Sequence, residues 1–273
     1  MDVVDFYDHH PISAGQVLAA VRRRRGGLDG PLRAEDLFDH DQDHYGGLAA
    51  VETLARRAGI GPRSRVLDVC AGLAGPARFL AARRGCQVVA LELNAGRAAG
   101  GARLTRLVGL EPRVRVVRGD ATALPLASGR FDACISQEAL LHVHDKAAVL
   151  REAHRVLVAG GRLAFTDWVA RSRLSDGERR RLREWMAATT LQTLDGYQAL
   201  LGRAGFHAVE AEDLAAEWRR ILAERLTMYR AMRAETVARL GEARYQDYEQ
   251  LSTFFVGLVE AGKLGGGRFT GSR

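Results

Sequence analysis

Residues 65–75 read RVLDVCAGLAG, and this stretch decides the fold. The apolar positions within 65–69 predict a short strand, and a helix predicted over 76–84 follows directly after the loop. The small residues in that loop allow the backbone to approach a ligand closely and the helix to pack on the sheet. Taken alone the loop is a weak signal, because a tight turn that binds nothing would explain it as well.

The same alternation continues along the chain. Short apolar runs separated by turns predict further strands over 87–93, 113–118, 131–136, 162–168, 206–214 and 265–271. Helical patterns lie between the early strands, and connections of this kind join parallel strands. We therefore predict an α/β fold with a mostly parallel seven-stranded sheet and helices on both of its faces.

The chain is longer than such a sheet requires. We divide it into a helical N-terminal lid over 1–47, a ligand-binding core over 48–170, a helical insertion over 171–194 and a closing part over 195–273. The insertion and the helical stretch after residue 214 are expected to cap a substrate. The side chains that could line this cap are Trp185, Tyr197, Trp218, Met228 and Tyr229, although the same residue types at helical spacing also fit a plain core.

The composition indicates an ordinary globular protein. Of 273 residues, 47% are hydrophobic and 27% are charged, a balance that excludes intrinsic disorder. Three cysteines are too few for a disulfide framework, and the acidic N-terminus does not fit a signal peptide. Without an apolar run of about 18 residues, we expect a cytoplasmic protein and no membrane span. The 40 Lys and Arg against 33 Asp and Glu give +7, which raises the hypothesis of a nucleic-acid partner.

Acidic residues stand at the carboxyl ends of the first three predicted strands, where open parallel sheets bind their ligands. Asp68 would repel the pyrophosphate of a dinucleotide and instead suits a ligand with an ammonium and a sulfonium, such as S-adenosylmethionine. Glu92 can accept hydrogen bonds from ribose hydroxyls, and Asp120 can accept one from the exocyclic amino group of adenine. Together the three acids favour S-adenosylmethionine over NAD as the cofactor, and they disfavour a dehydrogenase.

Five segments match, in order, the motifs of a known family: VLDVCAGLAGPARFLA, VVALELN, VRGDATALP, FDACISQEALLHV and LREAHRVLVAGGRLAFTDW. From about residue 48 to 214 the chain resembles class I S-adenosylmethionine-dependent methyltransferases, and among them the sarcosine/dimethylglycine N-methyltransferase group. The resemblance implies a Rossmann-like methyltransferase fold with S-adenosylmethionine as cofactor. The further cofactor-binding residues expected at the matching positions are Cys70, Ala71, Gly72, Gly75, Leu93, Ala121 and Gln137, with Tyr45 from the lid.

The chain departs from the family pattern at two positions of the first loop. Cys70 and Ala74 stand where the pattern has glycine. Both residues are small, so a close approach to the ligand is expected to survive. The loop is, however, expected to avoid positive φ angles at these two residues.

The segment after the fourth strand is where an acceptor is expected to meet the methyl group. The sulfonium is an activated donor, so the protein has to align a nucleophile and exclude water, and it needs no metal. An amine acceptor must also lose a proton, and we expect His142 to be the base, oriented by Glu138 one helical turn before it. A histidine held for structural reasons is an equal alternative for His142.

The predicted function is N-methylation of a small amine that resembles a glycine derivative. Similarity to methyltransferases of other small molecules is nearly as good in the core, so O- or C-methylation of a natural product, quinone or terpenoid stays open. Residues 136–139 read SQEA where amino-methylating DNA enzymes have a (D/N/S)-P-P-(Y/F/W) motif. We therefore expect a small-molecule acceptor and no nucleic-acid or membrane partner, while RNA methylation, a non-catalytic binder and a homodimer stay open.

His40 and His44 lie four residues apart among three aspartates, a spacing that suits zinc on a helix. Methyl transfer needs no metal, and a polar lid uses the same residue types. We therefore favour a lid at 39–47 and expect no metal.

Overall fold

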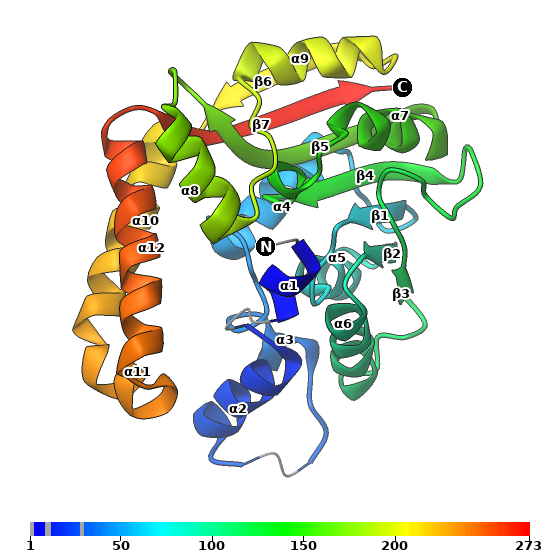
Figure 1. Cartoon of the computed structure of the whole chain (residues 1–273). Coiled ribbons are helices and arrows are strands. Elements are labelled where there is room, and N and C mark those ends of the chain that lie inside the picture. The colour runs from blue at the N-terminus through cyan, green and yellow to red at the C-terminus, as the bar shows by residue number, and fades with distance from the viewer. Residues whose placement is uncertain (1–2, 9–11, 28–29) are drawn as a thin grey trace.

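The structure, a computed structural model, describes residues 3–8, 12–27 and 30–273. Its centre is one sheet in the strand order β3-β2-β1-β4-β5-β7-β6 (Figure 1). The strands are β1 (Arg65–Val69), β2 (Gln87–Glu92), β3 (Val114–Arg118), β4 (Phe131–Gln137), β5 (Leu157–Ala170), β6 (His207–Asp213) and β7 (Leu264–Ser272). β1 to β5 pair in parallel, whereas β7 is antiparallel to both β5 and β6. The predicted α/β fold with a mostly parallel seven-stranded sheet is confirmed.

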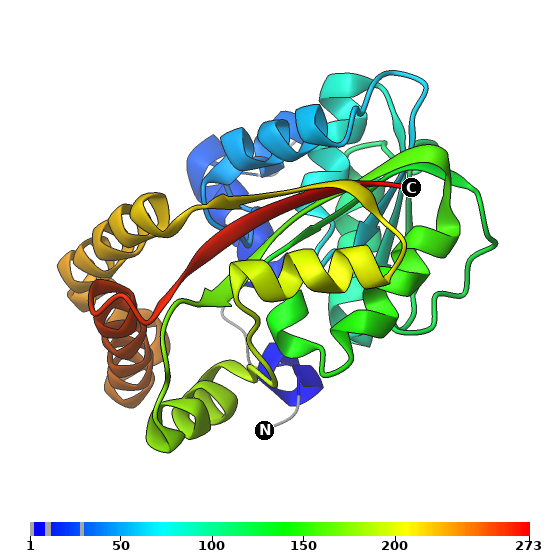
Figure 2. The ribbon, with the colours of Figure 1, turned by 90° about the horizontal axis from the view of Figure 1, so that it is seen from above.

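Helices cover both faces of the sheet. The helices are α1 (Val3–Asp8), α2 (Ala14–Arg25), α3 (Ala34–Leu37), α4 (Gly47–Arg57), α5 (Gly75–Arg84), α6 (Ala95–Leu107), α7 (Lys146–Val156), α8 (Asp176–Met186), α9 (Leu194–Arg203), α10 (Ala215–Ala231), α11 (Arg233–Leu240) and α12 (Glu242–Glu260), with a 3-10 turn η1 (Leu140–His142). From above, α7 and α9 lie on one side of the sheet and α4 lies on the other (Figure 2). Across residues 3–8, 12–27 and 30–273, every helix is too short or too polar to traverse a bilayer.

Successive apolar side chains of the central strands point alternately to the two faces of the sheet, and a buried core lies on each face. Val66 of β1 lies in a buried cluster with Leu54 of α4 and residues of α5. Its neighbour Leu67 lies in a second cluster with Leu150 of α7 and residues of α9. Successive side chains of a strand point to opposite faces, so an uninterrupted apolar strand is what a sheet covered on both sides requires.

The helices that follow β6 form an arm at one end of the sheet. α10 packs against α12 and β7, and α11 packs against α12 (Figure 1). A third buried cluster joins this arm to α8 and the end of β5, with Trp168, Trp218, Leu222 and Phe255 among its members. The helical character predicted for 171–194 is seen in α8, and the stretch after residue 214 is divided into three helices.

A buried ion pair ties the N-terminal segment to the core. Asp41 Oδ2 accepts hydrogen bonds from Arg78 Nε at 3.1 Å and from Nη2 at 2.8 Å, and both side chains are 0% exposed. Gly75, at the start of α5, lies directly beneath this segment, and a Cβ there would come within 2.0 Å of the Asp41 carbonyl oxygen. The residues that precede α4 are therefore held against α5, beside the carboxyl ends of the strands.

Candidate active site

A cavity of about 410 Å³ opens at the carboxyl ends of the parallel strands, and α1 contributes to its wall. Ten of the predicted site residues line it: Asp68, Cys70, Ala71, Gly72, Glu92, Leu93, Asp120, Gln137, Glu138 and His142. Ligands of open α/β sheets bind at this edge, because the loops after each strand converge there. Gly75 and Ala121 lie outside this lining, Gly75 beneath the N-terminal segment and Ala121 in the buried core.

Two polar side chains in this cavity hold buried atoms that have no hydrogen-bond partner within the described part of the chain. They are Asp68, at its Oδ2, and the half-buried Gln137, at both its amide oxygen and its amide nitrogen. Burial and, to a smaller extent, the charge of Glu92 raise the pKa of Asp68 to about 7, against the opposing charge of Arg78. Polar atoms in this state cost free energy unless a ligand or water satisfies them.

The other two strand-end acids are engaged in local hydrogen bonds. Glu92 accepts from the backbone N–H of Gly72 and of Asn94, each at 2.8 Å, so it fixes the first loop against the start of α6. Asp120 Oδ1 accepts from the backbone N–H and the hydroxyl of Thr122, also at 2.8 Å. Each carboxylate oxygen has two lone pairs, so these bonds leave acceptor capacity toward the cavity.

The expectation for the first loop was wrong. Cys70 and Ala74 both adopt left-handed backbone conformations, each with φ 59°. Ala74 stands immediately before α5, where the chain has to turn from the strand into the helix. The turn demands this geometry whether or not a glycine is present, so this sequence bears a strain of about 1–2 kcal/mol at each position.

We predict that the variant with glycine at position 70 is more stable than the variant with alanine at the same position. The free energy of unfolding should be about 0.5–1 kcal/mol higher for Cys70→Gly than for Cys70→Ala. Glycine relieves the strain of the left-handed conformation, and this gain outweighs the larger chain entropy that glycine loses on folding. Urea denaturation measures the difference. Ala81, inside α5, is the control: Ala81→Gly should destabilise by about 1 kcal/mol or more. A lower stability for glycine at both positions would contradict the prediction.

His142 and Glu138 do not form the pair that we expected. Glu138 accepts from Thr166 Oγ1 at 2.6 Å and from the backbone N–H of Tyr45 at 2.7 Å. Burial raises its pKa to about 7. His142 is hydrogen-bonded through Nε2 to the Tyr7 hydroxyl at 2.9 Å and through Nδ1 to the Ala187 carbonyl at 3.3 Å. A carbonyl only accepts, so Nδ1 carries the proton and the Tyr7 hydroxyl donates to Nε2.

The N-terminal segment and the start of α6 contribute side chains to the first cavity that were not predicted from the sequence. Arg97 Nη2 donates to Asp43 Oδ2 at 2.7 Å, and its guanidinium lies 4.6 Å from the ring centroid of Tyr7. All three residues line the first cavity, as does Asn94, which caps α6 by accepting from the Arg97 N–H. Asn94 could have been found from sequence as the cap that directly follows the second strand. Tyr7 and Asp43 carried no such signal.

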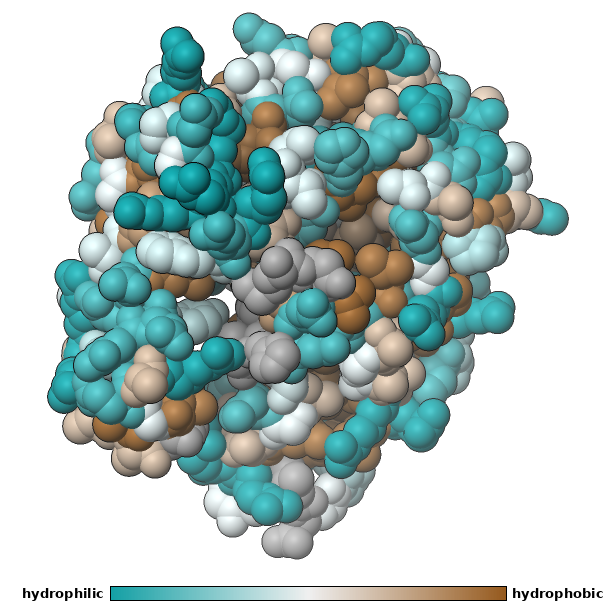
Figure 3. Space-filling model, viewed as in Figure 1, coloured by the Kyte–Doolittle hydropathy of each residue, from teal (hydrophilic) through white to brown (hydrophobic). Residues whose placement is uncertain are grey.

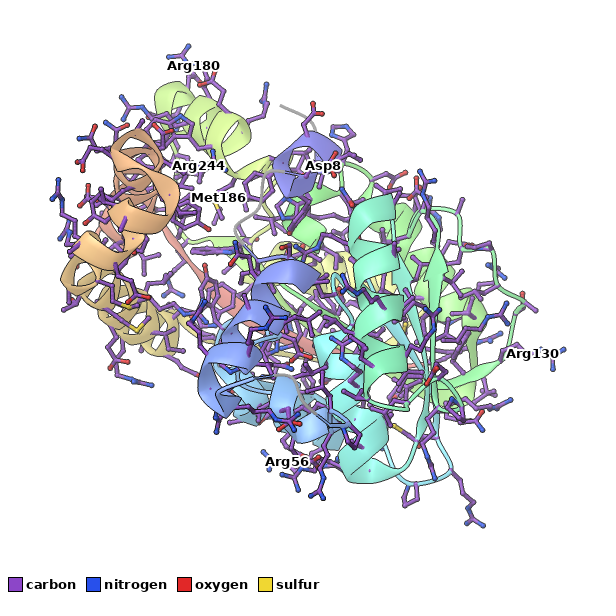
Figure 4. The ribbon with its side chains drawn as sticks, turned by 90° about the horizontal axis from the view of Figure 1, so that it is seen from below. Asp8, Arg56, Arg130, Arg180, Met186 and Arg244 are labelled. Atoms are coloured by element: carbon purple, nitrogen blue, oxygen red, sulfur yellow. The ribbon has the colours of Figure 1, made fainter. Side chains whose placement is uncertain are left out.

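A second cavity of about 610 Å³ adjoins the first, and five residues line both: Tyr7, Asp43, His44, Glu138 and His142. Tyr45 lies in this second cavity, where its ring contacts Trp168 and lies 4.7 Å from the Arg225 guanidinium. Seen from below, Met186 at the end of α8 faces the space between α1, which carries Asp8, and the α10–α12 arm (Figure 4).

The predicted cap residues divide between this cavity and the core. Met228 and Tyr229 line the second cavity. Tyr197 is fully buried between Phe165 and Phe269, and Trp218 packs against Trp168. Trp185 contacts Phe254 instead.

Of the two lid histidines, His44 has protein partners, whereas the buried Nε2 of His40 has no hydrogen-bond partner among the described residues. His44 Nε2 is hydrogen-bonded to Gln42 Oε1 at 2.9 Å and Nδ1 to the Tyr45 carbonyl at 3.2 Å. Burial lowers the pKa of His44 to about 4. Within residues 3–8, 12–27 and 30–273, no three His, Cys, Asp or Glu side chains are grouped so that they could hold a metal ion.

Comparison with known proteins assigns the core. The family described as "Methyltransferase domain" matches residues 67–165, which contain most of β1, all of β2, β3 and β4, and the loops after these strands that line the first cavity. Residues 67–165 are therefore similar to a methyltransferase domain. The fold around this domain is the Rossmann-like fold of class I S-adenosylmethionine-dependent methyltransferases, as the resemblance implied.

Individual relatives agree with this assignment. The chain is 33% identical over 165 residues to a glycine/sarcosine/dimethylglycine N-methyltransferase of Actinopolyspora halophila, covering 60% of this chain and 29% of that protein. It is 34% identical over 154 residues to a sarcosine/dimethylglycine N-methyltransferase of Halorhodospira halochloris, covering 56% of this chain and 55% of that protein. The chain therefore spans about a third of the length of the first of these curated relatives and about half of the length of the second.

A solved structure extends the likeness to the whole fold. Phosphoethanolamine N-methyltransferase 2 of Haemonchus contortus, in complex with phosphomonomethylethanolamine and S-adenosylhomocysteine, superposes with a TM-score of 0.83 at 18% identity. The match covers 100% of this chain and 60% of that one. At this identity the likeness shows the fold, including the helical arm that follows the core.

Proposed function

We propose that the protein is an S-adenosylmethionine-dependent methyltransferase that acts on a small molecule. The observation that carries the proposal is the set of buried, unpartnered polar atoms, Oδ2 of Asp68 and the amide group of Gln137, at the strand ends of the segment that matches a methyltransferase domain. Polar groups kept unpartnered in a fold usually meet a ligand there. A polar ligand seated in this cavity would supply what they lack.

The charge of the first cavity suits this cofactor. Among its described lining residues seven are Asp or Glu, and Arg97 is the one Arg or Lys. An excess of acids favours a ligand with a sulfonium and an ammonium and disfavours one with a pyrophosphate. We assign Asp68 to the methionine end of the cofactor, Glu92 to the ribose hydroxyls and Asp120 to the adenine amino group.

Catalysis then falls to residues at the junction of the two cavities. When bound, S-adenosylmethionine supplies a methyl group activated by the sulfonium, whose sulfur–carbon bond breaks as the bond to the acceptor forms. The chain has to align the acceptor, exclude water and take up the acceptor's proton. His142 lies at this junction, so we assign it as the base that receives the proton at Nε2, by way of the Tyr7 hydroxyl that donates to this atom. Glu138 orients the lid by accepting from Tyr45 and is a positioning residue.

We propose an amine as the methylated group, since a base lies at the junction and the two curated relatives are N-methyltransferases. A glycine derivative would have to pair its carboxylate with Arg225, an arginine in the lining of the second cavity. O- or C-methylation of a natural product, quinone or terpenoid is the second candidate, and the apolar part of that cavity favours it. We do not propose a nucleic acid as acceptor, because residues 136–139 lack the base-gripping motif.

The proposal predicts that S-adenosylmethionine binds through ionised Asp68. Because the pKa of Asp68 is raised to about 7, a cation bound beside it has to displace a proton at lower pH. Affinity should therefore rise as pH increases from 6 to about 7.5 and level off above that. Asp68→Asn should weaken binding by about 10- to 100-fold at pH 8 and flatten the dependence on pH. Isothermal titration calorimetry over this range measures both effects.

The matched control for Asp68 is Asp132. This aspartate pairs with Arg65 at the opposite, amino end of the strands. Asp132→Asn should leave the affinity and its pH profile unchanged. If wild-type protein binds no S-adenosylmethionine, the proposed function is wrong, and an equal profile for wild type and Asp68→Asn would remove Asp68 from the cofactor site.

A further inference from the structure

We infer that the acceptor is an amphipathic molecule with a bulky apolar skeleton and one nucleophilic polar end, and not a free glycine derivative. This inference rests on the proposed function and concerns the second cavity. The structure gives that cavity two chemically different ends. The residues it shares with the first cavity are polar: Tyr7, Asp43, His44, Glu138 and His142.

The other end of the cavity is apolar. It lies between α8 and the α10–α12 arm and is lined by Met186, Leu226, Met228, Met232, Leu251 and Phe255, among others. Ligand skeletons are held mainly by apolar contacts, with a few polar groups to fix their orientation. A molecule whose nucleophile lies beside His142 would therefore extend its remaining carbon skeleton into this region.

The size of the second cavity also favours an acceptor that is larger than a glycine derivative. Its volume of about 610 Å³ lies in the range that accommodates drug-sized ligands, about 300–1,000 Å³. Sarcosine or dimethylglycine would occupy a small part of it and leave the apolar walls in contact with water. Such a ligand would gain almost nothing from the side chains that make up most of the lining.

The charges of the second cavity disfavour an anionic acceptor. Arg225 is the one Arg or Lys among its described lining residues, against Asp39, Asp43 and Glu138. Its Nη2 donates to the His44 carbonyl at 2.8 Å, and its guanidinium lies over the ring of Tyr45. A carboxylate would have to draw on a guanidinium that already holds the lid in place, close to several acids.

Two methionines at the rim of the cavity extend the apolar surface to solvent. Met228 is 57% exposed and Met232 is 43% exposed, which places them among the few large apolar side chains exposed in the described structure. Methionine adapts its shape to different apolar ligands. A narrow opening separates the arm from the body of the protein on this face of the molecule (Figure 3).

Binding of a homologous series of primary n-alkylamines, from butylamine to decylamine, tests the inference. The protein is first saturated with S-adenosylhomocysteine, and dissociation constants are measured by calorimetry alongside those of sarcosine and dimethylglycine. We expect affinity to rise by up to about fourfold for each methylene added, until the cavity is filled. Both glycine derivatives should bind more weakly than octylamine.

A pair of adjacent positions on α12 supplies the matched variants. Ser252 lines the cavity, whereas its neighbour Thr253 is exposed on the same helix. Ser252→Trp should weaken decylamine binding tenfold or more, because the indole would fill the apolar end. Thr253→Trp should leave decylamine binding unchanged. Unchanged affinity for S-adenosylhomocysteine in both variants verifies that they fold.

The outcomes separate the inference from the function on which it rests. Wild-type protein that binds neither S-adenosylmethionine nor S-adenosylhomocysteine overturns the proposed function and the acceptor role with it. Protein that binds the cofactor but shows no dependence on chain length overturns the inference alone. Tighter binding of sarcosine or dimethylglycine than of octylamine does the same, as would equal effects of Ser252→Trp and Thr253→Trp.

Discussion

Replacing His142 by alanine is expected to lower the rate of methyl transfer by about 10²- to 10⁴-fold, the usual contribution of a general base. The reason is its position: His142 lines both cavities, and its Nε2 accepts from the Tyr7 hydroxyl, through which a proton from the acceptor can reach it. The dissociation constant for S-adenosylmethionine should change much less. Single-turnover rates measured with saturating cofactor, together with calorimetry, separate the two quantities.

Two further variants show whether the loss is specific to His142. Tyr7→Phe removes the hydroxyl that donates to Nε2 and should lower the rate by a smaller factor than His142→Ala. His207→Ala changes an exposed histidine on the edge strand β6 and should leave the rate as in wild type. Equal rates for wild type and His142→Ala would exclude the base assignment and favour a structural role for the ring.

The predictable part of the site follows from the order of the strands. Asp68, Glu92 and Asp120 end successive strands, and the carboxyl ends of parallel strands necessarily meet at one edge of the sheet. The order of the strands therefore predicts that the three acids surround a single cavity, and all three line the first cavity. The rule requires only the strand boundaries, which uninterrupted apolar runs define well.

The pairing of Glu138 with His142 failed for a local reason. A spacing of four residues brings two side chains to one face only on a continuous α-helix. Here Glu138 has a φ of 47°, and residues 140–142 form a 3-10 turn before α7 begins at Lys146. The two side chains consequently take different partners. Asp145 is the signal for the late start of the helix, because its side chain caps α7 by accepting from the backbone N–H of Ala148.

The features of the site that the sequence did not predict depend on long-range contacts. Tyr7 reaches His142 across 135 positions of sequence, and the second cavity depends on how the α10–α12 arm packs beside α8. Periodicity predicts that these helices exist, but it does not distinguish an apolar face that lines a cavity from one that fills a core. Met228 and Trp218 show the difficulty, because both lie on α10 and only the first lines the cavity.

The largest effect on stability is expected at the buried pair of Arg78 and Asp41. Removing one partner, by Asp41→Ala or Arg78→Met, should lower the unfolding free energy by about 3–5 kcal/mol, because the other charge remains buried and uncompensated. Arg78 also donates to the Gly101 carbonyl and the Thr105 hydroxyl, each at 3.2 Å. The pair thus joins the lid, α5 and α6. Urea denaturation of wild type and variants measures the loss.

An exposed pair and a double variant test whether burial is the cause. Arg24 and Asp39 form an ion pair with side chains 59% and 57% exposed, so Asp39→Ala should cost less than about 1 kcal/mol. Combining Asp41→Ala with Arg78→Met removes both buried charges, and the double variant should lose less stability than the sum of the single variants. Additive losses, or a cost at Asp41 no larger than at Asp39, would mean that the lid is held by packing alone. If burial is the cause, the ion pair fixes the position of the segment whose Asp43 and Tyr45 reach the two cavities.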